Sequence, residues 1–124
     1  SRGCKLLAME LNIPVVVLAQ LNRETEHSKG SKPKLSNLRD SGSIEQDADV
    51  VIFLHSDFKS GNLTNEKGES TEYERDLIVA KYRNGATKDI KLGFEPTKMN
   101  LFELDNYMPS GLSEMVEEKT ELKF

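Results

Sequence analysis

The fold is decided by one continuous stretch, Leu38-Arg39-Asp40-Ser41-Gly42-Ser43-Ile44-Glu45-Gln46-Asp47-Ala48-Asp49, which runs directly into Val50-Val51-Ile52-Phe53-Leu54. A polar loop that contains a glycine is followed by a short helical turn over residues 44–48, with Ser41 or Ser43 as the expected N-cap. The apolar run 50–54 then predicts a buried strand. We therefore expect the charged and backbone groups of the loop at the edge of a sheet, where they can hold an anionic partner.

Upstream of this stretch, the sequence predicts a helix and a second buried strand. Apolar residues over 2–11 fall roughly on one helical face, and the helix ends at Asn12 because Pro14 cannot continue it. Residues 15–19 form a continuous, mainly β-branched run without alternation. Such a run is typical of a strand that is buried on both faces in a parallel sheet covered by helices.

Downstream, the sequence predicts an antiparallel hairpin. Residues 76–83 indicate a strand, Asn84-Gly85 is a strong tight-turn signal, and the alternating residues 90–94 predict the returning strand. Residues 99–104 add a last short strand, and the polar residues 56–72 form a loop or loose hairpin. The order predicts an α/β fold, the second half of an open sheet that is mostly parallel and carries one antiparallel hairpin. Residues 1–104 are assigned to this partial domain, and residues 105–124 to an acidic tail that is a weak helix or disordered.

Composition limits the classes of protein to which the chain can belong. Its 124 residues make one domain at most, and 31% charged residues indicate a soluble surface. The net charge of −4 argues against a generally basic nucleic-acid-binding protein, so any DNA affinity must come from a local patch. The single cysteine, Cys4, allows no intrachain disulfide and fits a reducing cytoplasm. No apolar run approaches the ~18 residues of a membrane span.

Several catalytic signatures are missing from the sequence. There is no G-x-x-x-x-G-K-[ST] loop to hold phosphates and no strand that ends in an acidic residue to hold Mg²⁺. His27 and His55, with one cysteine, do not have the spacing of a metal site or a catalytic triad, so no metal site is predicted. We therefore expect this chain by itself to catalyse no reaction.

Gln20 follows the predicted strand over 15–19, at the carboxyl edge where ligands lie in open α/β sheets. A glutamine amide there can hydrogen-bond a γ-phosphate or the attacking water and so sense hydrolysis. The alternative is a polar residue that merely ends a strand, and position alone favours it.

Arg39, Asp40 and Gly42 lie in the loop before the short helix. Glycine allows close approach of the backbone, successive N–H groups can form an anion-binding nest, and Arg39 adds a cation for phosphate. The alternative is a helix-capping loop with a solvated arginine, and the residues alone do not decide between the two.

Lys81 and Arg83 are two residues apart on a predicted strand, so they point to the same face just before the turn. Two cations at a stiff tip can reach a phosphate on a neighbouring subunit, as an arginine finger does. The alternative is a solvent-facing hairpin edge whose charges discourage aggregation, and position alone favours it.

Together these stretches resemble the C-terminal RecA-like motor domain of the bacterial replicative DNA helicase, the DnaB family. The matching stretches run in order from about Ser1 to Glu103: Ser1-Arg2 with Lys5-Leu6-Leu7-Ala8, Glu10-Leu11-Asn12-Ile13-Pro14-Val15-Val16, Gln20-Leu21-Asn22-Arg23, residues 38–49, Ile78-Val79-Ala80-Lys81-Tyr82-Arg83-Asn84-Gly85 and Lys91-Leu92-Gly93-Phe94-Glu95-Pro96.

The resemblance implies a role for each candidate residue. Gln20 is the γ-phosphate sensor, Arg39, Asp40 and Gly42 bind the backbone of single-stranded DNA, and Lys81 and Arg83 reach the neighbouring subunit's γ-phosphate. It also implies a cytoplasmic homohexameric ring that uses ATP and Mg²⁺, translocates on single-stranded DNA, and has primase and a helicase loader as candidate partners. In a ring only the channel lining must be positive, which explains how an acidic chain can bind DNA.

The chain also departs from the family pattern, and two other function classes stay open. The phosphate loop and the Mg²⁺-binding strand would lie before Ser1, and Ser56 stands where the family often has an arginine. One alternative function is another RecA-like ring ATPase of the recombinase type. The other is a non-enzymatic remnant that only binds partners.

Overall fold

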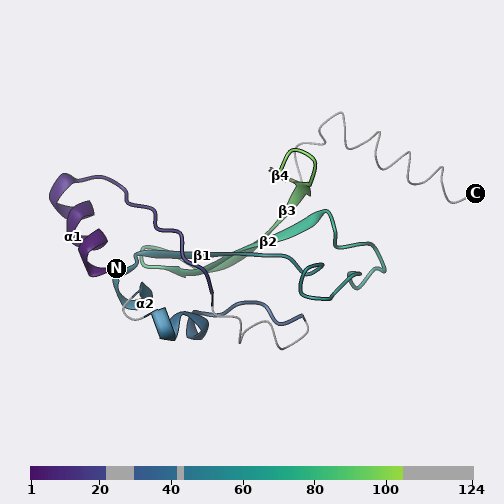
Figure 1. Ribbon diagram of the computed structural model, residues 1–124, viewed down its shortest axis with the longest axis horizontal. Helices are drawn as coiled ribbons and strands as arrows, with labels where there is room; N and C mark the ends of the chain where they lie inside the picture. The colour runs from purple at the N-terminus through teal and green to yellow at the C-terminus, as the bar shows by residue number, and fades with distance from the viewer. Residues whose placement is uncertain (22–29, 42–43, 105–124) are drawn as a thin grey trace, which may run out of the picture.

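The computed structural model describes residues 1–21, 30–41 and 44–104, and the predicted acidic tail over 105–124 lies outside these residues. The described elements are the helix α1 (Arg2–Leu11), the 3-10 helix η2 (Leu35–Ser41), the short helix α2 (Ile44–Asp47), and the strands β1 (Val50–His55), β2 (Glu74–Tyr82), β3 (Lys88–Glu95) and β4 (Asn100–Glu103). Figure 1 shows a long sheet with α1 at one end and α2 beneath β1.

The helix α1 confirms the prediction for residues 2–11. It ends at Asn12, which adopts the left-handed conformation (φ 51°, ψ 47°) and donates its backbone N–H to the carbonyl of Ala8. Asparagine tolerates this conformation better than most residues, and Pro14 follows immediately, so the sequence stops the helix here. The apolar side chains of α1 remain exposed, among them Leu6 at 57% and Met9 at 67%.

The four strands form one sheet in the order β1-β2-β3-β4, and every neighbouring pair is antiparallel. The hairpin predicted over 76–94 is confirmed, with strands that are longer than expected. Its turn is wider than the predicted Asn84-Gly85 turn, because residues 83–87 all lie outside the strands. A register shift between Val51 and Ile52 leaves Ala80 without a partner in β1, which bends β2 near its end.

The strand predicted over residues 15–19 does not form. Residues 13–20 have no regular secondary structure, and the side chains of Val16 and Leu18 are 86% and 95% exposed. A strand exists only through hydrogen bonds to a neighbouring strand, and none of the described strands pairs with this segment. For the same reason the expected parallel part of the sheet is not seen among the described strands.

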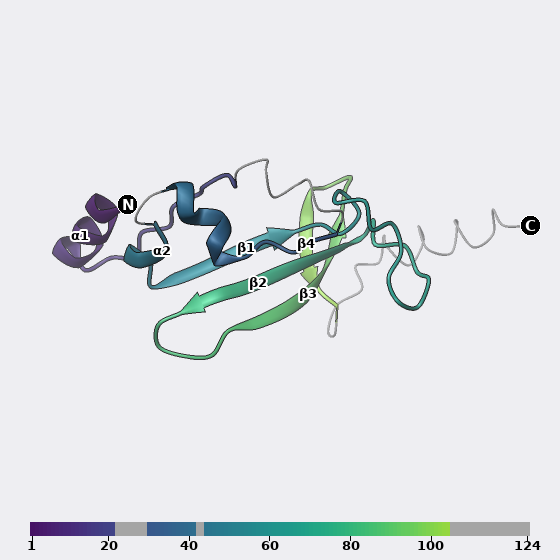
Figure 2. The ribbon, with the colours of Figure 1, turned by 90° about the horizontal axis from the view of Figure 1, so that it is seen from below.

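One face of the sheet is covered and carries the core. The strand β1 alternates between exposed and buried side chains, and Val51 and Phe53 pack with Ile78 of β2 and Leu38 of η2. The partly buried residues Leu21, Leu35, Ile44, Ala48 and Ala80 surround this cluster. Figure 2, seen from below, shows η2 and α2 lying on this side of the sheet near β1.

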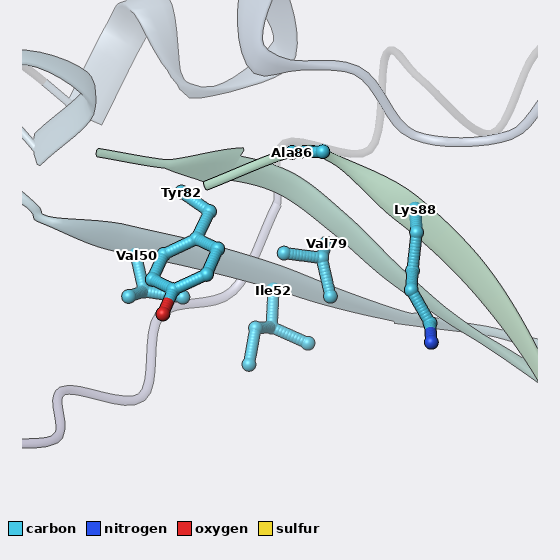
Figure 3. A pocket seen from close by; sticks show the side chains of 6 residues that line it. All are labelled: Val50, Ile52, Val79, Tyr82, Ala86 and Lys88. Atoms are coloured by element: carbon cyan, nitrogen blue, oxygen red, sulfur yellow. The ribbon is translucent and has the colours of Figure 1, made fainter. Parts of the chain in front are cut away.

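The opposite face of β1 is apolar but open, which differs from the strand buried on both sides that the sequence predicts. Its side chains Val50, Ile52 and Leu54 are 45%, 52% and 58% exposed. Together with Val79, Tyr82, Ala86 and Lys88, the first two line an open apolar hollow of about 290 Å³ (Figure 3). The hollow offers a ligand few polar groups, so it is not a candidate catalytic site.

Residues 56–72 form the loop or loose hairpin that the sequence predicts, with one bridge between Thr64 and Ser70. Inside this loop, Asn65 Oδ1 accepts hydrogen bonds from the backbone N–H groups of Lys67 and Glu69. The hydroxyl of Thr71, which is buried, donates to the carbonyl of Asn62. None of the described helices is long and apolar enough to cross a lipid bilayer.

Candidate functional site

The two predicted trans-acting cations lie at the end of β2 and contact the helix that follows the predicted DNA-binding loop. Lys81 Nζ donates to the carbonyl of Glu45 (2.6 Å) and more weakly to that of Gln46 (3.4 Å). Arg83 Nη2 donates to the same Gln46 carbonyl (3.2 Å). Both side chains reach one carbonyl, so they lie on one face, as their spacing predicts.

These contacts have a local physical cause. The last carbonyls of a helix have no partner within the helix, and the helix dipole places partial negative charge there. The helix α2 has only four residues and no basic residue in its last turn, so the cations that satisfy its carbonyls come from β2. Arg83 remains half exposed (49%), which leaves part of its guanidinium open to solvent.

Asp49, between α2 and β1, connects three parts of the fold. Its carboxylate accepts hydrogen bonds from Lys5 of α1 (2.6 Å to Oδ1) and pairs with Arg83 Nη1 (3.2 Å). Its carbonyl accepts the backbone N–H of Arg83 (2.9 Å). The hydrogen bond from Lys5, supported by the charges of Lys5, Arg83 and Lys81, holds the pKa of the Asp49 carboxyl below its usual 3.8. Asp49 is therefore ionised at neutral pH.

The predicted DNA-binding loop is partly helical. Arg39 and Asp40 lie in η2, where the sequence predicts a loop, and Gly42 lies outside the described residues. The start of η2 is fixed locally, because Asn37 Oδ1 accepts the backbone N–H of Lys34 (2.6 Å) and the Asn37 N–H donates to the Lys34 carbonyl (2.9 Å). Leu38, only 3% exposed, anchors η2 in the core.

Gln20 does not stand at the end of a buried strand, because residues 15–19 form none; its side chain is exposed. The next residue, Leu21, packs against the core cluster. The backbone at Gln20 is therefore close to an anchored position, but the structure does not bring its amide into the site formed by Lys81, Arg83 and Asp49.

A cluster of charged side chains at the opposite end of β2 was missed by sequence reasoning. Its centre is Asp76, which is 2% exposed and pairs with Lys91 of β3 (2.7 Å to Oδ1) and with Lys32 (3.2 Å to Oδ2). The other members are His55, Asp57, Glu74 and Asp89. The only available signal was a charged residue inside an apolar strand pattern. Lys32 thereby ties the start of the segment that carries η2 to the sheet.

The electrostatics of this cluster favour the charged forms of both central partners. Burial by itself raises the pKa of Asp76, but Lys91 and then Lys32 outweigh it, so the pKa lies below the usual 3.8. Burial likewise lowers the pKa of Lys91, and Asp76 more than offsets it, so that pKa lies above 10.5. No three His, Cys, Asp or Glu side chains in the described part of the chain are arranged to hold a metal ion.

Comparison with known proteins places this arrangement in a family. The family model "DnaB-like helicase C terminal domain" matches residues 1–103. The "Replicative DNA helicase DnaB" of Leifsonia xyli subsp. xyli is 53% identical over 95 residues, which cover 77% of this chain and 20% of the relative. The protein of the same name from Mycobacterium leprae is 50% identical over 95 residues, which cover 77% of this chain and 15% of the relative. The chain thus spans a fifth or less of these relatives.

Solved structures agree with this result. One solved helicase ATPase domain has a TM-score of 0.73 and 35% identity, covering 84% of this chain and 35% of its own. A DnaB-like replicative helicase, solved to describe its interactions with primase, has a TM-score of 0.74 and 35% identity, covering 85% and 24%. Both neighbours are RecA-like helicase ATPase domains, which confirms the predicted fold class. The chain therefore belongs to the DnaB-like helicase C-terminal domain family.

Proposed function

We propose that this chain is part of a replicative DNA helicase that couples ATP hydrolysis to translocation on single-stranded DNA and to duplex unwinding in DNA replication. The observation that carries the proposal is the contact between Lys81 and Arg83 and the carbonyls of α2, which directly follows the loop with Arg39, Asp40 and Gly42. A group that meets a phosphate at the subunit boundary and a group that meets DNA then lie on one connected unit.

The roles of the individual residues follow from this arrangement. Lys81 and Arg83 are the cations that stabilise charge on the neighbouring subunit's γ-phosphate. Arg39, Asp40 and Gly42 contact the DNA backbone, because arginine and exposed backbone N–H groups bind phosphate without reading sequence. Gln20 is the γ-phosphate sensor, and this role requires the extended segment 13–20 to join a sheet, which would bring the amide to a strand end.

The cofactors are ATP and Mg²⁺. The cationic, partly exposed pair Lys81 and Arg83 fits a contact with phosphate. The chain holds no G-x-x-x-x-G-K-[ST] loop, and its described carboxylates form no metal cluster, so its residues do not fit the primary nucleotide and Mg²⁺ site. The residues of this chain contribute the charge from the other side of the subunit boundary.

The proposed assembly is a cytoplasmic homohexamer at the replication fork. Its partners are single-stranded DNA, primase and a helicase loader; primase is favoured because one structural neighbour was solved to describe its interactions with primase. The relatives named replicative DNA helicase favour this proposal over a recombinase-type ring ATPase and over a non-enzymatic remnant.

The test uses a helicase subunit of the relatives' full length that carries these residues. We expect ATP hydrolysis stimulated by single-stranded DNA, unwinding of a forked duplex, and a native mass of a hexamer. Hydrolysis with strand exchange but no unwinding would instead indicate the recombinase type. No nucleotide turnover at all, in a correctly assembled ring, would indicate the remnant.

A further inference from the structure

We propose that Asp49 is a positioning residue for Arg83, and that Lys5 neutralises Asp49 so that Arg83 keeps its positive charge for a phosphate. The inference rests on the proposed role of Arg83 at the neighbouring subunit's triphosphate. It adds two residues, from α1 and from the link between α2 and β1, to the nucleotide-facing corner.

Three contacts define where the Arg83 side chain lies. Its backbone N–H donates to the Asp49 carbonyl (2.9 Å), Nη1 pairs with Asp49 Oδ1 (3.2 Å), and Nη2 donates to the Gln46 carbonyl (3.2 Å). An exposed arginine otherwise samples many rotamers, and ordering it at the moment of reaction costs free energy. The contacts supply that order in advance and still leave further N–H groups of the guanidinium for a phosphate.

Charge balance explains the part played by Lys5. A carboxylate paired with Arg83 alone would cancel the charge that a phosphate needs. Lys5 Nζ lies 2.6 Å from Oδ1 and 2.5 Å from Oδ2 of Asp49, so one negative charge is shared by two cations. The sum over Lys5, Asp49 and Arg83 stays positive, and Lys81 adds to it. An anion that approaches this corner is therefore attracted, while Arg83 remains oriented.

The contact is specific to Asp49 among nearby acids. Asp47, at the end of α2, is engaged by the hydroxyl of Ser1 (2.5 Å). Asp49 alone, among the described residues, pairs with Arg83. Lys5 is 44 residues before Asp49 in sequence. The packing of α1 near α2 is therefore what creates the charge arrangement, and α1 gains a function although its side chains are not buried.

The experiment compares Asp49→Ala, Asp49→Asn and Lys5→Met in the full-length ring, with Asp89→Ala as a matched control, because Asp89 is also an exposed aspartate paired with a lysine. We expect Asp49→Ala to lower kcat of DNA-stimulated ATP hydrolysis about three- to tenfold with an unchanged KM for ATP. Asp49→Asn, which keeps an oxygen acceptor for Arg83, should recover part of that loss. Asp89→Ala should have no effect.

A double variant tests the charge argument. Lys5→Met should lower kcat about twofold in the parent protein, because Asp49 then pairs with Arg83 alone. In the Asp49→Ala background the same change should have no further effect, since Lys5 acts through Asp49. Independent, multiplying losses would overturn the proposal, as would an unchanged kcat in Asp49→Ala rings of normal mass.

Failure of this inference can be told apart from failure of the proposed function. If Arg83→Ala abolishes turnover while Asp49→Ala and Asp49→Asn are fully active, the positioning role is wrong and the trans-acting role stands. If Arg83→Ala is itself fully active, the proposed role of Arg83 fails first. Should Asp49→Ala rings fail to assemble, the Asp49→Asn rings decide by the same kcat measurement, and full activity in them overturns the charge argument.

Discussion

The two ends of β2 use charge in opposite ways. At one end Asp76 is buried to 2% exposure and satisfied by Lys91 and Lys32. At the other end Arg83 is 49% exposed and makes surface contacts with a carbonyl and a carboxylate. A buried pair is costly to break because its partner is left desolvated, whereas a surface contact exchanges readily for another anion. One strand thus combines a fixed end with an end that can accept a ligand.

Both ends also hold the same segment of chain. Lys32 ties its start to Asp76, and Lys81 and Arg83 bind Glu45, Gln46 and Asp49 at its end. Gly30 adds a backbone hydrogen bond to Ser60 (3.3 Å). The segment that carries the predicted DNA-contacting residues is therefore connected to the cations at the subunit boundary through β2, which is a short physical path between the two proposed sites.

The largest expected effect breaks the ligand-accepting end. Arg83→Ala in the full-length ring should reduce ATP hydrolysis by about 1000-fold or more, as loss of an arginine finger does, while binding of ATP survives. Steady-state turnover and equilibrium binding of a fluorescent ATP analogue measure the two quantities. Lys88→Ala, on the same hairpin but lining the open hollow, is the matched control. Normal turnover of the Arg83→Ala ring would remove the trans-acting role.

The next effect breaks the fixed end. Asp76→Asn should destabilise β2 and β3 locally by about 2–3 kcal/mol, because Lys91 and Lys32 lose their buried partner; the partial exposure of both lysines keeps the cost below that of a fully buried pair. Amide hydrogen exchange of the two strands measures the change. Exchange indistinguishable from the parent protein would show that the cluster contributes no stability.

A smaller effect separates the structural from the functional use of the cations. Lys81→Met removes the hydrogen bond to the Glu45 carbonyl and the favourable interaction with the end of α2, and should cost about 0.5–1.5 kcal/mol in protection of residues 44–48. Lys88→Met is the control for a lysine without this contact. Unchanged protection at the Ala48 amide, which donates to Ile44 (3.0 Å), would contradict the capping role.

The smallest effect is a pH dependence of the fixed end. Since the folded pKa of Asp76 is depressed, its stabilising contribution is complete above the unfolded value of 3.8 and is lost as pH falls through the lower folded value. Exchange protection of β2 should therefore fall in acid more steeply in the parent protein than in Asp76→Asn. Equal acid sensitivity of the two proteins, compared at about pH 3 and pH 7, would contradict the assignment.

The elements that the sequence predicted correctly are governed by local rules. Asn12 and Pro14 stop α1 through backbone conformation, and the alternation in β3 follows from the two-residue period of a strand. The DnaB-family resemblance was also available from the order of motifs, since these motifs are contiguous in sequence. The strand predicted over 15–19 failed because an apolar run states a preference, and only a neighbouring strand can satisfy its backbone.

By itself the sequence determined the helix α1, the hairpin strands, the family and the identity of the cationic pair Lys81 and Arg83. Only the tertiary structure decided what those cations contact, that Asp49 joins them to Lys5, and that Asp76 is buried between Lys91 and Lys32. The physical reason is range. Backbone conformation and periodicity act over a few neighbouring residues, whereas pairs such as Lys81 with Glu45 or Lys5 with Asp49, 36 and 44 residues apart, exist only once the chain has packed.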